Sequence, residues 1–186
     1  MPLPALLSRN NPRLSKRDFG HLLIIAGSPT MLGAAALSSL AAMRSGAGLV
    51  TAAVCRGLNL TLQEKISHVV MTKPLAQNRK GSFSLKAYDE LKKGWDQYDA
   101  LAIGPGIGRE PSTQQFARQV IIHCPKPLVI DADALFALAG HTDILLKAKG
   151  PRILTPHEGE MARLINKKNR DVSQFKNGRR SYFLYV

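Results

Sequence analysis

The stretch ALAIGPGIG at residues 100–108 decides the class of fold, because a short aliphatic run passes directly into a glycine-rich turn. The run at 100–103 is apolar throughout, which is typical of a strand buried on both faces of a parallel sheet. A helix expected at 112–123 and a second aliphatic run at 128–130 follow it. A strand, a helix and another strand in this order predict an α/β domain with a parallel sheet.

The same alternation extends along the chain in both directions. We expect strands at 22–26, 49–54, 69–72, 100–103, 128–130 and 152–154. We expect helices at 33–44, 84–93, 112–123, 134–139 and 158–165. In the first helix, Leu37, Leu40, Ala41 and Met43 are expected to face inward, and the glycines at 46 and 48 to end it. The pattern predicts three layers, with helices on both faces of the sheet.

Composition excludes several classes of protein. Hydrophobic residues make up 45% of the 186, which suffices for a core, and no apolar run is long enough to span a bilayer. The two cysteines, Cys55 and Cys124, allow no disulfide framework and are expected to be small buried residues. No secretory signal is recognisable at the start, so we expect a cytoplasmic protein without a membrane partner.

The net charge of +13 is high, and it favours an anionic partner. Basic residues are scattered, however, and aromatic residues make up only 6% of the chain. Because single-strand binders interleave basic and aromatic side chains, the composition favours solvated basic faces and a small anionic ligand over a nucleic acid.

Four segments directly follow expected strands, and ligands of parallel sheets gather at that end. They are residues 26–28, 104–108, 131–133 and 155–160. The glycines at 104–108 permit close approach of a phosphate or a ring, although a tight turn explains them equally well. The spacing matches neither the dinucleotide fingerprint nor a phosphate-binding P-loop. The convergence of four such segments is the signal that predicts a ligand site.

Two of these segments carry ionisable side chains. Asp131 is a candidate to bind Mg²⁺ through water or to contact ribose hydroxyls, whereas Asp133 is expected to cap the next helix. Thr155 is expected to cap the last helix, with Glu158 completing a capping box, which leaves His157 as a candidate ligand contact. We expect no protein metal site, since no second His or Cys has a suitable spacing.

Six stretches occur in the order found in one known family. They are residues 23–28, 31–35, 42–51, 102–108, 129–135 and 153–164. Together they resemble the ADP-dependent (S)-NAD(P)H-hydrate dehydratases of the ribokinase-like superfamily, over roughly residues 17–177. The resemblance implies a ribokinase-like three-layer α/β/α fold with a mostly parallel central sheet.

The resemblance also implies an activity, partners and site residues. Members of the family dehydrate the S epimer of hydrated NADH or NADPH, with ADP as co-substrate and Mg²⁺, and release AMP and phosphate. By position, Ala34, Gly106 and His157 match residues that contact the hydrated nucleotide, and Asp131 lies in the matching cleft strand. The resemblance further implies a homo-oligomer for full-length members.

The sequence departs from the family at its end. The family continues with a Lys-Gly strand and a Gly-x-Gly-Asp segment that supplies the expected catalytic base, and this sequence contains no Gly-x-Gly-Asp. The catalytic residue is therefore unassigned. We expect an N-terminal arm at 1–16, a domain at 17–177 that is truncated and incomplete at its C-terminal end, and an atypical tail at 178–186 that is either an edge strand or ill ordered.

Two alternatives to the dehydratase remain at this point. The first is a ribokinase-like kinase of a vitamin precursor, which shares the fold and the glycine turns. The second is a non-catalytic nucleotide-binding fragment, which the missing Gly-x-Gly-Asp segment favours. A nucleic-acid binder would rest on net charge alone, and its binding would collapse with added salt.

Overall fold

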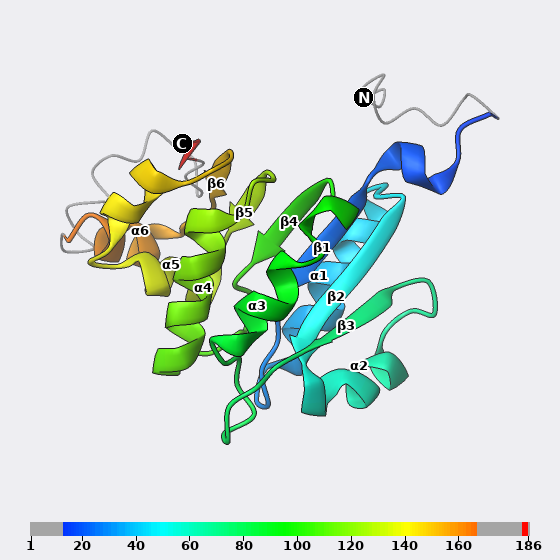
Figure 1. Cartoon of the computed structure of the whole chain (residues 1–186), viewed down its shortest axis with the longest axis horizontal. Helices are drawn as coiled ribbons and strands as arrows, with labels where there is room; N and C mark the ends of the chain where they lie inside the picture. The colour runs from blue at the N-terminus through cyan, green and yellow to red at the C-terminus, as the bar shows by residue number, and fades with distance from the viewer. Residues whose placement is uncertain (1–12, 167–183, 186) are drawn as a thin grey trace.

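A parallel sheet forms the centre of the computed structural model, which describes residues 13–166 and 184–185 (Figure 1). Six of its strands are parallel: β1 (His21–Ile25), β2 (Leu49–Cys55), β3 (Met71–Leu75), β4 (Ala100–Ile103), β5 (Leu128–Ile130) and β6 (Arg152–Leu154). The sheet order is β3-β2-β1-β4-β5-β6-β7. The chain therefore winds outward from β1 in one direction and from β4 in the other.

Helices cover both faces of this sheet. The longer ones are α1 (Leu32–Arg44) and α4 (Pro111–His123). The shorter ones are α2 (Asn59–Lys65), α3 (Lys86–Lys92), α5 (Ala132–Leu138) and α6 (Glu158–Leu164). Short 3-10 turns are η2 (Lys16–Phe19), η3 (Arg56–Leu58), η4 (Trp95–Gln97) and η5 (Thr142–Lys147). The expected three-layer α/β/α architecture is confirmed.

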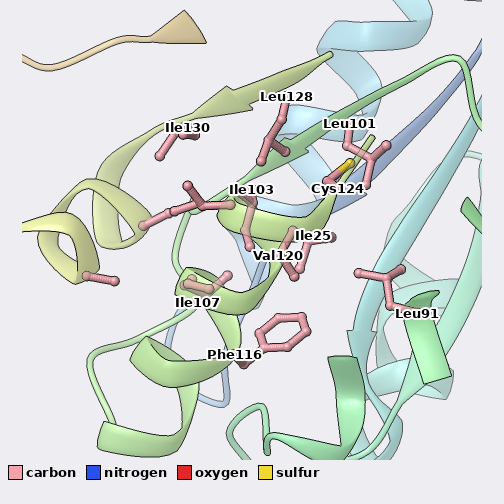
Figure 2. Packing of buried hydrophobic residues seen from close by; sticks show 14 of the residues in the cluster. Ile25, Leu91, Leu101, Ile103, Ile107, Phe116, Val120, Cys124, Leu128 and Ile130 are labelled. Carbon is pink, nitrogen blue, oxygen red and sulfur yellow. The ribbon is translucent and has the colours of Figure 1, made fainter. Parts of the chain in front are cut away.

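Strand alternation divides the core between the two faces. Leu23, Ile25 and Ile103 point to the face covered by α3, α4 and α5 and join the larger cluster, part of which Figure 2 shows. Ile24 and Val50 point to the opposite face and pack with α1 and α2. Strands β1 and β2 therefore contribute to both clusters, which explains why their sequences are almost entirely apolar.

Both cysteines lie within this packing, as expected. Cys55 and Cys124 are free and fully buried. Burial raises the pKa of the Cys55 thiol to about 12 and that of Cys124 to about 11. Both thiols therefore stay protonated and unreactive at neutral pH.

The first helix corrects one prediction. Its buried residues are Ala35 and Ser39, whereas Leu37, expected to face inward, is 72% exposed. Ala41 is exposed as well. The helix approaches the sheet through its smallest side chains, because small residues let it pack closely over β1 and β2. Gly46, with φ at +101°, follows the helix end as expected.

The observed strands lie close to their predicted positions, with one displacement. The strand expected at 69–72 is found at 71–75, because Thr51–Cys55 of β2 pairs with Met71–Leu75. At the other edge, the backbone of β7 (Leu184–Tyr185) pairs antiparallel with β6, which corresponds to the edge-strand alternative. Most of the arm expected at 1–16 and of the tail expected at 178–186 lies outside the described residues, and those domain boundaries stay predictions.

Candidate functional site

The centre of the sheet holds the position at which ligands collect in such folds. Strands β1 and β4 are neighbours, yet the chain leaves them toward opposite edges. Their outgoing loops therefore separate above the carboxyl ends of the strands and leave a crevice. The two loops are joined at its base, where Gly27 N donates to the carbonyl of Pro105 at 2.9 Å.

Two of the predicted residues meet directly in this crevice. Gly106 has φ at +63°, and a Cβ atom built on it would lie 2.9 Å from the Cβ atoms of both Ala34 and Met31. The glycine turn after β4 is thus pressed against the start of α1. Only glycine fits there, because both the backbone angle and the space exclude a side chain.

Asp131 lies at the same edge, one strand further along. It is half-buried, and its Oδ1 accepts a hydrogen bond from Thr155 Oγ1 at 2.9 Å. A Cβ atom on Gly104 would lie 1.7 Å from the carbonyl oxygen of Asp131. Asp131 therefore contacts the loops on both sides of it, after β4 and after β6.

The prediction that Asp133 caps a helix is wrong. Asp131 occupies the N-cap position of α5, and Asp133 lies in its first turn, 8% exposed. Its Oδ2 accepts from Gly108 N and its Oδ1 from Arg109 Nε, both at 3.0 Å. The helix begins earlier than expected, and this turns the carboxylate toward the glycine loop, which it holds in place.

The prediction that Thr155 caps the last helix with Glu158 is also wrong. His157 is the N-cap of α6: its Nδ1 accepts from Gly159 N at 3.0 Å, and Glu160 Oε2 accepts from His157 N at 3.0 Å. Glu160 stands three residues after His157, which is the spacing of a capping box, and this signal was present in the sequence. The His157 side chain is 70% exposed, with Nε2 3.4 Å from Glu160 Oε1.

The crevice opens into a cavity of about 590 Å³. Its lining consists of residues 28–31, Lys80 and Ser82, residues 108–110 and Asp133. We call this cavity the switch-point cleft. A cavity of about 720 Å³ lies beside α6 and is lined largely by apolar side chains such as Leu154 and Leu164. We place the candidate site in the switch-point cleft, because it adjoins the contact between Gly106 and Met31.

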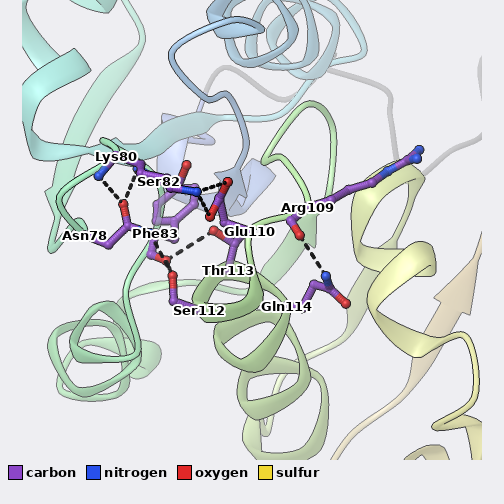
Figure 3. Close-up of polar contacts among 9 residues, drawn as sticks. All are labelled: Asn78, Lys80, Ser82, Phe83, Arg109, Glu110, Ser112, Thr113 and Gln114. Carbon is purple, nitrogen blue, oxygen red and sulfur yellow. Dashed lines mark hydrogen bonds and ion pairs between the residues drawn. The ribbon is translucent and has the colours of Figure 1, made fainter.

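One wall of the cleft was absent from the sequence-based prediction. A hairpin at 77–83, closed by the bridge between Gln77 and Phe83, carries Lys80 and Ser82. Figure 3 shows how it is fastened to the start of α4: Asn78 Nδ2 donates to Ser112 Oγ at 2.9 Å, and Ser112 Oγ donates to the Phe83 carbonyl at 2.9 Å. No local sequence signal reveals this contact, because it joins segments about thirty residues apart.

The charged side chains of the cleft compensate one another. Lys80 Nζ lies 3.1 Å from Glu110 Oε2, and Arg109 pairs with Asp133. The Arg109 guanidinium also stacks over the Phe136 ring, 4.5 Å from its centroid. Arg109 and Glu110 were missed as cleft residues in the sequence-based prediction, although their position directly after the glycine turn was an available signal.

The described part of the chain offers no complete metal cage. Within residues 13–166 and 184–185, no group of three or more His, Cys, Asp or Glu side chains is placed to hold a metal ion. Asp131 supplies a single carboxylate, with one oxygen already bonded to Thr155. Such a group fits Mg²⁺ only as an outer contact of an ion that substrate phosphates and water coordinate.

These features define a class of protein: a three-layer α/β domain of the ribokinase-like type with a candidate ligand cleft at its switch point. A ribokinase-like superfamily protein from Enterococcus faecalis superposes with a TM-score of 0.72 at 24% identity, over 91% of this chain and 55% of that one. The ADP/ATP-dependent NAD(P)H-hydrate dehydratase from Bacillus subtilis, co-crystallized with ATP/Mg²⁺, gives 0.68 at 29% identity, over 89% and 54%.

The chain belongs to the NAD(P)H-hydrate dehydratase family, whose sequence profile matches residues 22–181. The bifunctional NAD(P)H-hydrate repair enzyme Nnr of Moorella thermoacetica is 44% identical over 159 residues, which is 86% of this chain and 30% of that protein. The Nnr of Escherichia coli is 33% identical over 159 residues. The chain thus spans about 30% of the length of these curated relatives.

No helix in the described segments is both long and apolar enough to cross a membrane.

Proposed function

We propose that the chain functions in the repair of nicotinamide nucleotides, by ADP-dependent dehydration of the S epimer of hydrated NADH or NADPH. The products are NAD(P)H, AMP and phosphate. The contact of Gly106 with Ala34 and Met31 carries the proposal, since it presses a glycine turn against a helix start beside the switch-point cleft. The family membership and the dehydratase and repair functions named for its relatives support it.

The reaction needs positioning more than it needs a reactive side chain. Transfer of the terminal phosphoryl group of ADP to the ring hydroxyl leaves AMP, and loss of phosphate with a ring proton then restores the double bond. Such a transfer depends on alignment and charge stabilisation. We propose that Ala34 and Gly106 contact the hydrated nucleotide, that His157 contacts it from the loop after β6, and that Asp131 contacts ribose hydroxyls or a water on Mg²⁺.

The cosubstrate, the cellular location and the association of copies are part of the same proposal. ADP brings Mg²⁺ on its phosphates, and Asp131, which forms no ion pair within the described residues, is a carboxylate able to contact that ion through water. Two free, buried cysteines fit a cytoplasmic location. The exposed Leu37 and Leu60, each 72% exposed, suit association with further copies in the full-length protein.

The test mixes the chain with hydrated NADPH, ADP and Mg²⁺ and follows the absorbance of the reduced nicotinamide. Omission of ADP is the control, and binding of the hydrate is measured separately by calorimetry. ADP-dependent recovery of NADPH supports dehydration. Binding without recovery supports the non-catalytic alternative, which the absence of a Gly-x-Gly-Asp stretch favours. Failure to bind either hydrate contradicts the proposal.

A further inference from the structure

Ser28 combines two properties that call for an explanation. It follows β1 and lines the switch-point cleft, yet only 3% of the residue is exposed. Its Oγ has no hydrogen-bond partner among the described residues. A buried hydroxyl without a partner costs free energy, and buried polar groups in folded proteins are almost always paired.

The hydroxyl is not needed to hold the loop. The Ser28 carbonyl accepts from Met31 N at 3.0 Å, and Gly27 N donates to the Pro105 carbonyl, so backbone contacts fix the turn. The Ser28 side chain has a single heavy-atom torsion, and no hydrogen bond in the described segments restrains it. A turn about this torsion moves the oxygen between staggered positions at little cost.

The residues around Ser28 indicate which kind of ligand group its hydroxyl would bind. A Cβ atom on Gly108, across the cleft wall, would lie 3.9 Å from Ser28 Oγ. The charges that line the cleft pair with each other, Lys80 with Glu110 and Arg109 with Asp133. A phosphate would have to compete with two carboxylates for these cations, whereas a carboxamide or a hydroxyl group would not.

We propose that the Ser28 hydroxyl is a substrate-binding group, which forms a hydrogen bond with a neutral polar group of the hydrated nicotinamide riboside half of the dinucleotide. The inference rests on the proposed function and deepens it. Ser28 contributes to recognition of the half that reacts, so its contribution is the same for hydrated NADH and hydrated NADPH.

The chain supplies a matched control in Ser39. This residue is 0% exposed, and its Oγ likewise has no partner among the described residues, but it lies on the inner face of α1, away from the cleft. Ser28→Ala and Ser39→Ala therefore each remove one buried, unpaired hydroxyl. Both variants are expected to be as stable as the unchanged chain or slightly more stable without ligand.

The experiment measures the affinity of the unchanged chain and both variants for hydrated NADH and hydrated NADPH, together with the melting temperature without ligand. Ser28→Ala is expected to weaken binding of both hydrates by the same factor, about three- to tenfold, the value of one hydrogen bond. Ser39→Ala is expected to leave both affinities unchanged.

Three other results overturn the inference, and they differ from one another. Equal affinity of Ser28→Ala and the unchanged chain shows that the hydroxyl does not touch the substrate, while the proposed function stands. A loss confined to hydrated NADPH shows a phosphate contact instead. If the unchanged chain binds neither hydrate, the proposed function fails and this inference fails with it.

Discussion

At Gly106 the need for glycine is set by both backbone angle and space. Its φ is +63°, and the Cβ atoms of Ala34 and Met31 leave no room for a methyl group. We expect Gly106→Ala to lower the free energy of unfolding by about 1–3 kcal/mol, through strain and displacement of the turn. Binding of hydrated NADPH should weaken as well, which urea denaturation and calorimetry would measure.

Gly33 provides the control, because a Cβ atom there would meet nothing within 4 Å and the residue lies inside α1. Gly33→Ala should stabilise the chain by up to about 1 kcal/mol through helix propensity. Equal effects of the two substitutions would show that the turn does not depend on glycine at 106.

Arg152 is a buried cation at the start of β6, with an exposed fraction of 0%. Within the described residues, its guanidinium donates to backbone carbonyls only, those of Ile121, Cys124, Lys126, Gly150 and Pro151. The carbonyls of Ile121 and Cys124 lie at the C-terminal end of α4, and the Lys126 carbonyl lies in the loop that follows it. The residue thus satisfies carbonyl groups that have no other partner inside the helix, and the negative end of the helix stabilises its charge.

We expect Arg152→Met to lower the free energy of unfolding by about 3 kcal/mol or more, since several buried carbonyls lose their donor together. Arg118→Met is the control, because Arg118 is half-buried and, in the part of the chain that the structure describes, donates a hydrogen bond to the Ala137 carbonyl alone. Arg118→Met should lower the free energy of unfolding by only about 1 kcal/mol. Similar denaturation midpoints for the two variants would contradict the role of Arg152.

At the scale of the element, each strand serves two unequal faces. In β5, Ile130 is fully buried in the larger cluster, whereas its neighbour Val129 points to the opposite face and is half-buried. Val129 is aligned with Ala102 of β4 and Ile153 of β6, which are also half-buried. The helices that pack over this face, α1 and α2, contribute to a cluster with β1 and β2.

The two neighbours therefore differ in what their removal costs. Ile130→Ala should destabilise the chain by about 3 kcal/mol, because it leaves a cavity in a close-packed core. Val129→Ala should cost about 1 kcal/mol or less, because water already reaches part of its side chain. Thermal unfolding of both variants checks the difference, and equal shifts would mean that the described packing of this face is incomplete.

Element positions were largely predictable, and element faces were less so. The strands at 100–103, 128–130 and 152–154 were located to the residue, because short apolar runs between turns have few other interpretations. The inward face of α1 was predicted wrongly, since hydrophobicity favoured Leu37 while close packing selected Ala35 and Ser39. Both caps after β5 and β6 were also misplaced, each by two residues.

At the scale of the whole molecule, the net charge of +13 and the paired charges of the cleft predict different responses of binding to added salt. Non-specific binding of a DNA oligonucleotide should weaken by orders of magnitude between low and moderate salt. Affinity for hydrated NADPH should change less than about threefold over that range, because the cleft has little net charge to screen. Titrations at several salt concentrations test this, and a steep dependence for the nucleotide would indicate exposed cations as its main contacts.

Local sequence was enough to predict the α/β class, the glycine turn, the residues at the carboxyl ends of the strands and the family that they resemble. These properties are local, since they depend on apolar periodicity and on glycine at fixed offsets. Three features became visible only in the folded chain: the strand order that places the turns after β1 and β4 side by side, the hairpin wall with Lys80, and the Ser28 hydroxyl, which has no partner among the described residues. Those properties depend on contacts between distant segments, where packing and the pairing of buried polar groups select one arrangement among many that the local pattern permits.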